Sequence, residues 1–220
     1  MVLLGIIASC NPVPSPIIVT PPNPQTKQSA LGYENKSLEQ ILEEEISSVS
    51  VKVIIGDKQY FKDTYLDPRG ESFKKYSKVI GIFLVNPIIT KEYPSNFIFL
   101  NKDNKIAEQI NTLYHELGHY NCYRTECPCL FSPVKIIAEY HAFKFQIEMA
   151  LLSEREEIMR EAICNILGLS LTEGADSAHG IAAGAITKKP LFLELITFYK
   201  NKAGLYNSTD FVNSLFPEEN

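Results

Sequence analysis

The spacing of apolar and polar residues predicts helices and strands in a definite order. Residues 37–47 open with Ser-x-x-Gln, a capping-box pattern, and then repeat apolar residues at helical spacing. Short apolar runs bounded by turn residues predict strands over 49–55, 78–85 and 96–101. The first half of the domain is therefore expected to hold one helix and a small sheet.

From residue 105 onward the apolar residues follow a helical period. The pattern predicts helices over 105–121, 134–152, 153–169 and 190–202. Ser153 is expected to cap the third of these helices and Gly168 to end it. Glycines leave the stretch 175–187 unassigned. A small β-sheet followed by a helical bundle indicates the α+β class.

The first ten residues form an apolar run that ends in small residues and a cysteine. Ile7-Ala8-Ser9-Cys10 resembles the lipobox of bacterial lipoprotein signals, although no Lys or Arg precedes it. That resemblance implies removal of the signal, lipidation of Cys10 and a place at the cell envelope, tethered to its membrane. The alternative is a buried apolar strand with an incidental cysteine, which would leave a cytoplasmic protein.

A proline-rich segment follows the presumed signal. Residues 11–31 hold six prolines between Pro12 and Pro24, and such a chain is extended and semi-rigid. We interpret it as a tether, so the folded domain spans 32–220. The 45% hydrophobic content suits one domain with a core. The net charge of −5, without a basic run, argues against a nucleic-acid partner.

The stretch TLYHELGHYNC carries the strongest chemical signal in the chain. His115 and His119 are four residues apart, so on a helix both imidazoles project from one face and can bind one zinc ion. Glu116 lies between them and is placed to act as a general base toward a metal-activated water. Histidines at this spacing also occur by chance on solvated helices. The apolar stripe on the opposite face and the preceding strand favour a metal site.

The family of the site depends on its third ligand. The extended metzincin pattern requires Gly and His where the chain has Cys122 and Thr125, which excludes that family. The block from residue 96 to residue 152 is similar to the small gluzincins of the ImmA/IrrE-like family. The matching segments are NFIFLN, HELGH and, on the next helix, EYHAFKF. This resemblance implies a zincin-like catalytic helix, with His115, His119 and Glu139 as zinc ligands and Glu116 as the base.

Several residues around this pattern leave alternatives open. Gluzincins commonly carry Asp or Asn four residues after the ligand glutamate, where this chain has Phe143. Such groups orient a ligand histidine, so Phe143 raises the prospect of an impaired site. Asp176 is a rival third ligand, by a loose likeness to aspzincins. His179 is a candidate oxyanion stabiliser, and His141 is expected to point away from the metal.

The cysteines beyond Cys10 cluster after the HELGH segment. Cys122, Cys127 and Cys129 lie close together, and a disulfide among them would fasten the loop that leaves this helix. Cys164 stands between apolar residues and is expected to be buried.

These observations predict a membrane-tethered zinc metallopeptidase that acts on a peptide or protein substrate. The alternative is a lipoprotein that keeps the zincin fold and serves as a binding or structural module.

Overall fold

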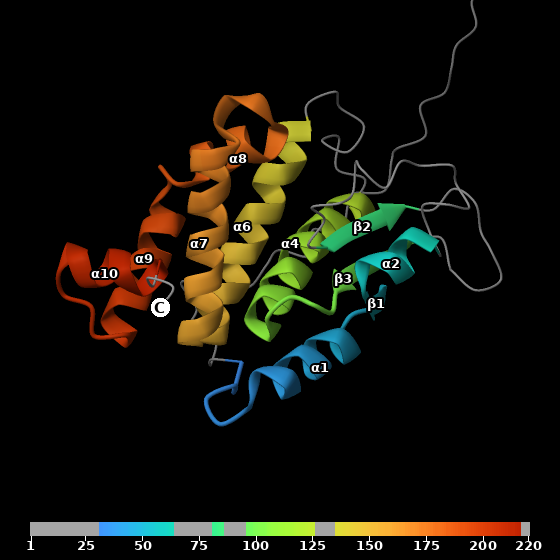
Figure 1. Cartoon of the computed structure of the whole chain (residues 1–220), viewed down its shortest axis with the longest axis horizontal. Coiled ribbons are helices and arrows are strands. Elements are labelled where there is room, and N and C mark those ends of the chain that lie inside the picture. Colours follow the sequence, from blue (N-terminus) through green and yellow to red (C-terminus); the bar gives the residue numbers. More distant parts are fainter. Residues whose placement is uncertain (1–30, 64–80, 86–95, 126–134, 217–220) are drawn as a thin grey trace, which may run out of the picture.

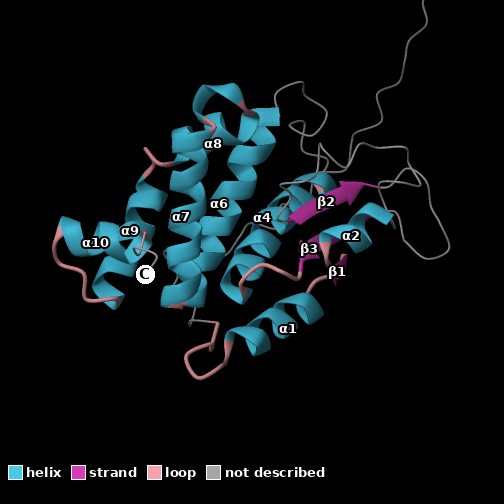
Figure 2. Ribbon diagram, in the orientation of Figure 1, coloured by secondary structure: helices cyan, strands magenta, loops and turns pink. Residues whose placement is uncertain are grey.

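The computed structural model describes residues 31–63, 81–85, 96–125 and 135–216. These residues are mostly helical and include a small mixed sheet, so the predicted α+β class is correct (Figures 1 and 2). The predicted signal with Cys10, the tether, Cys127 and Cys129 lie outside the described residues. Among the described helices, none has the length and apolar character needed to cross a membrane.

The domain begins with helix α1 (Leu38–Ser48), which starts as the sequence predicts. The Ser37 side chain accepts a hydrogen bond from the Gln40 N–H, and the Gln40 side chain accepts one from the Ser37 N–H. The reciprocal bonds satisfy two backbone donors at the helix start. Strand β1 (Lys52–Gly56) and the short helix α2 (Lys58–Phe61) follow.

The described sheet has three strands in the order β1-β3-β2. Strand β3 (Asn96–Asn101) lies in the centre, parallel to β1 and antiparallel to β2 (Gly81–Val85). The register pairs Phe83 with Ile98 and Ile54 with Phe99. Residues 97–101 of β3 are all buried, as expected for a strand covered on both faces. Strand β2 forms an edge of the described sheet.

The second half of the domain is helical. Its helices are α4 (Ile106–Arg124), α6 (Lys135–Ser153), α7 (Glu156–Thr172), α8 (Ala178–Ile186), α9 (Pro190–Lys202) and α10 (Ser208–Leu215), with a short 3-10 helix η3 (Gly174–Asp176) before α8. The predicted limits of α7 are wrong. Ser153 ends α6, Glu154 turns the chain with a φ of 50°, and Arg155 precedes the new helix. Gly168 lies inside α7, because an interior glycine weakens a helix without ending it.

Helix α4 lies at the centre of the molecule, between the sheet and the helices α6 and α7 (Figure 1). Its predicted apolar stripe is buried, with Ile110, Leu113 and Leu117 in the main core cluster. The opposite face of α4 also contains buried residues, because α6 and α7 cover it. The histidine face of α4 is therefore enclosed by protein on most sides.

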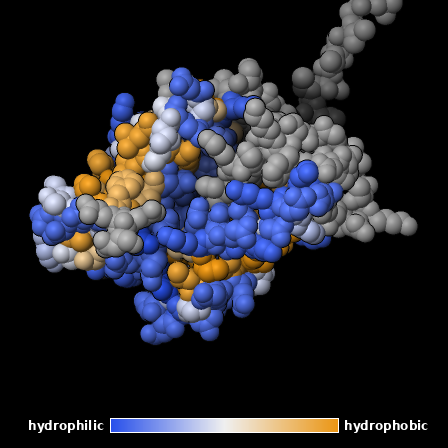
Figure 3. All heavy atoms as spheres, viewed as in Figure 1, coloured by the Kyte–Doolittle hydropathy of each residue, from blue (hydrophilic) through white to orange (hydrophobic). Residues whose placement is uncertain are grey.

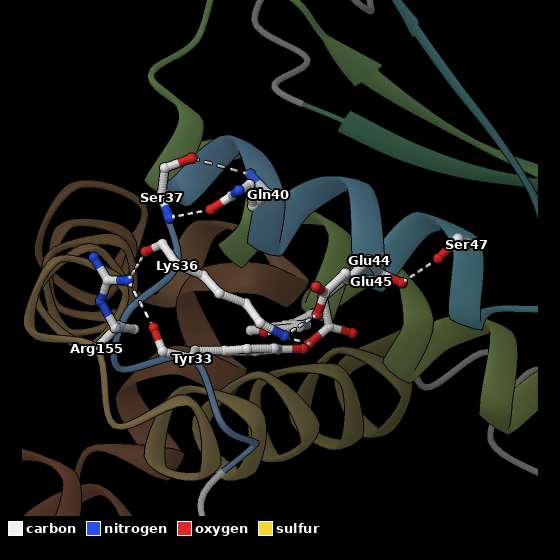
Figure 4. A network of polar contacts seen from close by, with 9 residues as sticks. Tyr33, Lys36, Ser37, Gln40, Glu44, Glu45, Ser47 and Arg155 are labelled. Atoms are coloured by element: carbon white, nitrogen blue, oxygen red, sulfur yellow. Dashed lines mark hydrogen bonds and ion pairs between the residues drawn. The ribbon is translucent and has the colours of Figure 1, made fainter.

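A polar network joins the start of the domain to α4 (Figure 4). Glu45, which is buried, accepts hydrogen bonds from the hydroxyls of Tyr33 at 2.8 Å and Tyr114 at 2.7 Å. Burial and the neighbouring Glu45 carboxylate raise the pKa of both tyrosines. Arg155 donates to the carbonyls of Tyr33 and Lys36, which fixes the segment before α1. Because Tyr114 directly precedes His115, this network anchors the helical turn that carries the first histidine.

The surface is mixed. Figure 3 shows apolar residues gathered over the helices at the left of that face and a hydrophilic band across its centre. Leu171 on α7 and Leu193 on α9 are among the exposed large apolar side chains.

Candidate metal centre

Helix α4 carries the first two histidines of the site. His115 and His119 lie one turn apart, with ring centroids 4.9 Å from each other. Their side chains are only 10% and 15% exposed, because α6 packs closely against α4. Two partly desolvated imidazoles on one helical face form the arrangement that the HELGH spacing predicts.

The glycine of HELGH determines how closely α6 approaches. A Cβ atom at Gly118 would lie 2.6 Å from the Cα of Ala142, which is nearer than van der Waals contact. The absence of a side chain at Gly118 therefore lets the two helices cross tightly. Glu139 lies one helical turn before Ala142 on α6, so the tight crossing brings its carboxylate against the histidines of α4.

A fourth side chain comes from the start of α8. The Ser177 hydroxyl accepts a hydrogen bond from the Gly180 N–H at 2.9 Å and donates one to Glu173. This capping arrangement fixes the first turn of α8 and places His179 over the site. The His179 side chain is 48% exposed, so it lies on the open side of the site.

The three histidines converge on one oxygen atom. Glu139 Oε2 lies 3.3 Å from Nε2 of His115, 3.3 Å from Nε2 of His119 and 3.1 Å from Nε2 of His179. This oxygen is buried, yet it has no hydrogen-bond partner among the described residues. Three ring nitrogens therefore surround a buried carboxylate oxygen at ion-pair distance.

This geometry can hold a metal ion. The donor atoms of His115, Glu139 and His179 lie within 4.8 Å of one another, and His119 adjoins them through its contact with Glu139. Imidazole nitrogen and carboxylate oxygen are ligands that suit zinc. The buried Glu139 Oε2 fits such a site, because a buried carboxylate oxygen is unfavourable unless a cation binds it, either a metal ion or a protonated imidazole.

The charges of the site reinforce one another. Burial acts to raise the pKa of Glu139, but the imidazoles of His115 and His119 outweigh it and hold that pKa well below its usual range. Burial acts to lower the pKa of His119, but the carboxylates of Glu139 and Glu116 outweigh it and raise that pKa. The carboxylate form of Glu139, which a metal ligand requires, is therefore favoured in the folded protein, whereas His119 must release a proton before it can bind a metal.

Glu116 is held by the sheet and not by the histidines. Its Oε2 accepts a hydrogen bond of 2.7 Å from the backbone N–H of Phe83 on β2. The strand can come this close because it begins at Gly81, where a Cβ atom would collide with Thr112 of α4. Two residues along a strand and one turn along a helix both advance about 6 Å, so Gly81 faces Thr112 and Phe83 faces Glu116.

Phe143 occupies the place where gluzincins commonly carry Asp or Asn. It is fully buried, and its ring packs on His115 with centroids 4.7 Å apart. Nδ1 of His115 is buried and has no hydrogen-bond partner among the described residues. Phe143 thus orients the imidazole by packing and supplies no acceptor for the ring N–H.

A cavity of about 560 Å³ opens from the site along α4. His115, Glu116, Phe143 and His179 line the end near the histidines. The cavity continues between α4, α6 and α7 toward the start of α4. Its volume is within the usual range for small-molecule and peptide side-chain sites.

Comparisons of the chain with protein families, curated proteins and solved structures found no match. A functional proposal for this chain therefore depends on the geometry of its own site.

The structure arranges the other candidate residues as follows. Asp176, the rival ligand, is exposed in η3 and is not part of the metal-holding group. His141 is largely exposed on α6, and partial burial of its ring together with the charge of Lys144 lowers its pKa. Cys122 is buried and forms no disulfide with a described cysteine; its predicted partners lie outside the described residues, so the disulfide stays a prediction.

Two features of the site were missed by sequence reasoning. His179 was expected near the reacting groups, but its contact with Glu139 was not foreseen, because η3 and the start of α8 gave no clear periodicity. The bond from Phe83 to Glu116 uses a backbone N–H, and no residue type signals it.

Proposed function

We propose that this protein is a zinc-dependent peptidase of gluzincin type, in which His115, His119 and Glu139 hold the metal. The observation that carries the proposal is the convergence of the histidine Nε2 atoms on the buried Oε2 of Glu139. Two imidazoles and one carboxylate form a ligand set of catalytic zinc sites, which keep one position open for water or substrate.

The surrounding residues support hydrolysis. When bound, a zinc ion lowers the pKa of water and polarises a carbonyl group. Glu116 lies in the same cavity as His115 and accepts no hydrogen bond on Oε1 from the described residues. We assign it the role of accepting a proton from the attacking water and passing that proton to the leaving amine nitrogen. The Phe83 N–H keeps this carboxylate oriented during both transfers.

A peptide substrate fits the surroundings of the site. Strand β2 forms an edge of the described sheet and borders the cavity at Gly81. An extended peptide can add to such an edge by main-chain hydrogen bonds. This supports a peptide or protein substrate over a small metabolite.

A second function is supported by two observations on the same residues. His179 offers a fourth protein ligand to the metal, and Phe143 leaves His115 Nδ1 without an acceptor. A site with four protein ligands is closed and structural. The alternative function is therefore a metal-stabilised binding module without catalysis. Replacing His179 with Ala separates the two, since metal content is retained if the site is catalytic and falls if it is closed.

The test of the peptidase proposal uses Glu116→Gln. We expect this variant to retain the metal content of the parent and to lose peptide hydrolysis by about 100-fold or more, the usual contribution of a general base. Glu194→Gln, a change on the exposed side of α9, is the matched control and should hydrolyse like the parent. Undiminished hydrolysis in Glu116→Gln would exclude Glu116 as the base.

We further propose that the domain is lipid-anchored through Cys10 at the cell envelope. The chain enters the described domain at Leu31, whose N–H donates to the carbonyl of Leu152 near the end of α6. Glu139 lies about 20 Å from that point along the same helix, at the rise of an α-helix. In cell fractionation, Cys10→Ala should move the protein from the membrane fraction to the soluble one, and an unchanged distribution would reject the anchor.

A further inference from the structure

The described lining of the cavity beyond the histidines is acidic. It includes Glu108, Glu116, Glu161 and Glu173, and among the described residues no lysine or arginine lines the cavity. Glu116 and Glu173 have roles near the metal centre and the start of α8. Glu108 on α4 and Glu161 on α7 face the part of the cavity away from the histidines, and no role has been assigned to them.

These two carboxylates lie close enough to affect each other. Burial raises the pKa of Glu108, and the charge of Glu161 raises it further. Glu161 has one flanking cation, Arg160, whose Nη2 lies 3.3 Å from its Oε1, and Lys105 is near Glu108. Neither cation lines the cavity. Among the described residues, the cavity side of this pair therefore has no cation facing it.

The floor of the cavity offers a further acceptor. Gln146 on α6 is only 1% exposed and lines the cavity, and its Oε1 has no hydrogen-bond partner among the described residues. Its Nε2 donates to Asn111 Oδ1 at 3.4 Å. Asn111 Nδ2 in turn donates to the carbonyls of Ala107 and Ile158. Both amide donors of Asn111 are thus engaged within the protein and the Gln146 amide donates to Asn111, while the Gln146 acceptor has no partner among the described residues.

A ligand that satisfies this part of the cavity must bring hydrogen-bond donors and positive charge. A guanidinium group carries five N–H donors and no acceptor, and an ammonium group carries three. Glu108 precedes His115 by two helical turns, about 10 Å along α4. A long basic side chain that extends from a backbone at the metal centre, together with the Glu108 side chain that extends toward it, can bridge this separation.

We infer that Glu108, Glu161 and Gln146 form a subsite for a basic side chain, arginine or lysine, of the peptide substrate. The assignment to a substrate rests on the proposed peptidase function. Binding of a cationic side chain by these residues does not depend on the peptidase function, because none of them belongs to the metal centre.

The test compares two blocked amino acids of nearly equal shape with the full-length protein. N-acetyl-arginine amide carries a guanidinium, and N-acetyl-citrulline amide replaces it with a neutral urea group. We expect NMR titration to give a dissociation constant at least about tenfold lower for the arginine probe, since hydrogen bonds to charged groups are the stronger ones. Equal affinities, or no binding of either probe, would overturn the subsite.

Variants assign the effect to the named residues. Glu108→Gln should remove most of the preference for arginine, and Glu161→Gln is the second variant if the first is poorly folded by circular dichroism. Glu194→Gln, exposed on α9, should keep the preference. A preference that survives in both cavity variants would refute the assignment.

Hydrolysis of paired peptides separates this inference from the peptidase proposal. If arginine is preferred in binding but no peptide is cleaved, the subsite stands and the peptidase function fails. If peptides with arginine and with citrulline are cleaved equally well, the peptidase function stands and the subsite fails.

Discussion

The tight crossing of α4 and α6 at Gly118 makes a measurable prediction about stability. In Gly118→Ala, the new Cβ would lie 2.6 Å from the Cα of Ala142, whereas carbon atoms pack at about 3.5–4.0 Å. Helix α6 must therefore retreat by about 1 Å. Overpacking of this kind costs about 1–3 kcal/mol, and the better helix propensity of alanine returns up to about 1 kcal/mol. We expect a net loss of about 1–2 kcal/mol.

Gly168 offers a matched control in the same protein. It also lies inside a helix, but nothing lies within 4 Å of a Cβ atom built there. Gly168→Ala should therefore gain up to about 1 kcal/mol from propensity alone. Urea unfolding of the metal-free proteins measures both changes. Equal stabilities of the two variants would show that α6 does not depend on Gly118 for its approach.

The same substitution should act on the metal site. A retreat of α6 moves Glu139 away from the histidines of α4, because Glu139 lies one turn from Ala142. We expect metal affinity in Gly118→Ala to fall roughly tenfold, as for other changes that displace ligands indirectly. Gly168→Ala should keep the affinity of the parent. If Gly118→Ala lost stability but kept the metal affinity of the parent, the helix crossing would not determine the geometry of the metal site.

Three further predictions concern the surroundings of the metal. Phe83→Pro removes the N–H that donates to Glu116 at 2.7 Å. Compared with the control Phe83→Ala, it should lower kcat/KM about 10-fold or more and leave the metal content unchanged. Equal kcat/KM values in the two variants would refute the orienting role of the Phe83 N–H. Phe143→Asn supplies a hydrogen-bond acceptor for the buried Nδ1 of His115. It should tighten metal binding about tenfold, measured by chelator competition, although the lost packing costs about 3 kcal/mol of stability. Weaker metal binding by the folded variant would contradict the role given to this acceptor. Burial and the charge of Glu161 raise the pKa of Cys164 to about 11. Alkylation of Cys164, measured by mass spectrometry, should therefore be slow at pH 8 and accelerate up to about pH 11. Fast alkylation at pH 8 would contradict the raised pKa.

The sequence predicted those elements whose signals are local. The Ser37–Gln40 capping box formed as expected, and strand β3 and helix α9 have the predicted limits. The start of α7 was wrong, because Ser153 has the composition of a cap but lies in the last turn of α6. Short α2 and α10 were missed. The strand order β1-β3-β2 arises from long-range pairing, which periodicity does not encode.

The site shows the same division between local and long-range information. The spacing of His115 and His119 follows from one helix, so the sequence was sufficient to place them together. The approach of Glu139 needed a tight helix crossing, and only a family resemblance pointed to it. The contact of His179 with Glu139 depends on how η3 and α8 fold back, which no local pattern indicates.

The most direct test of the account is the zinc content of the purified protein. Inductively coupled plasma mass spectrometry should find about one zinc per chain in the parent, and His115→Ala and Glu139→Gln should each lose most of it, since a site missing one of its ligands binds much more weakly. Less than about half a zinc per chain in the parent, or full occupancy in Glu139→Gln, would contradict the proposal that these residues hold a catalytic metal.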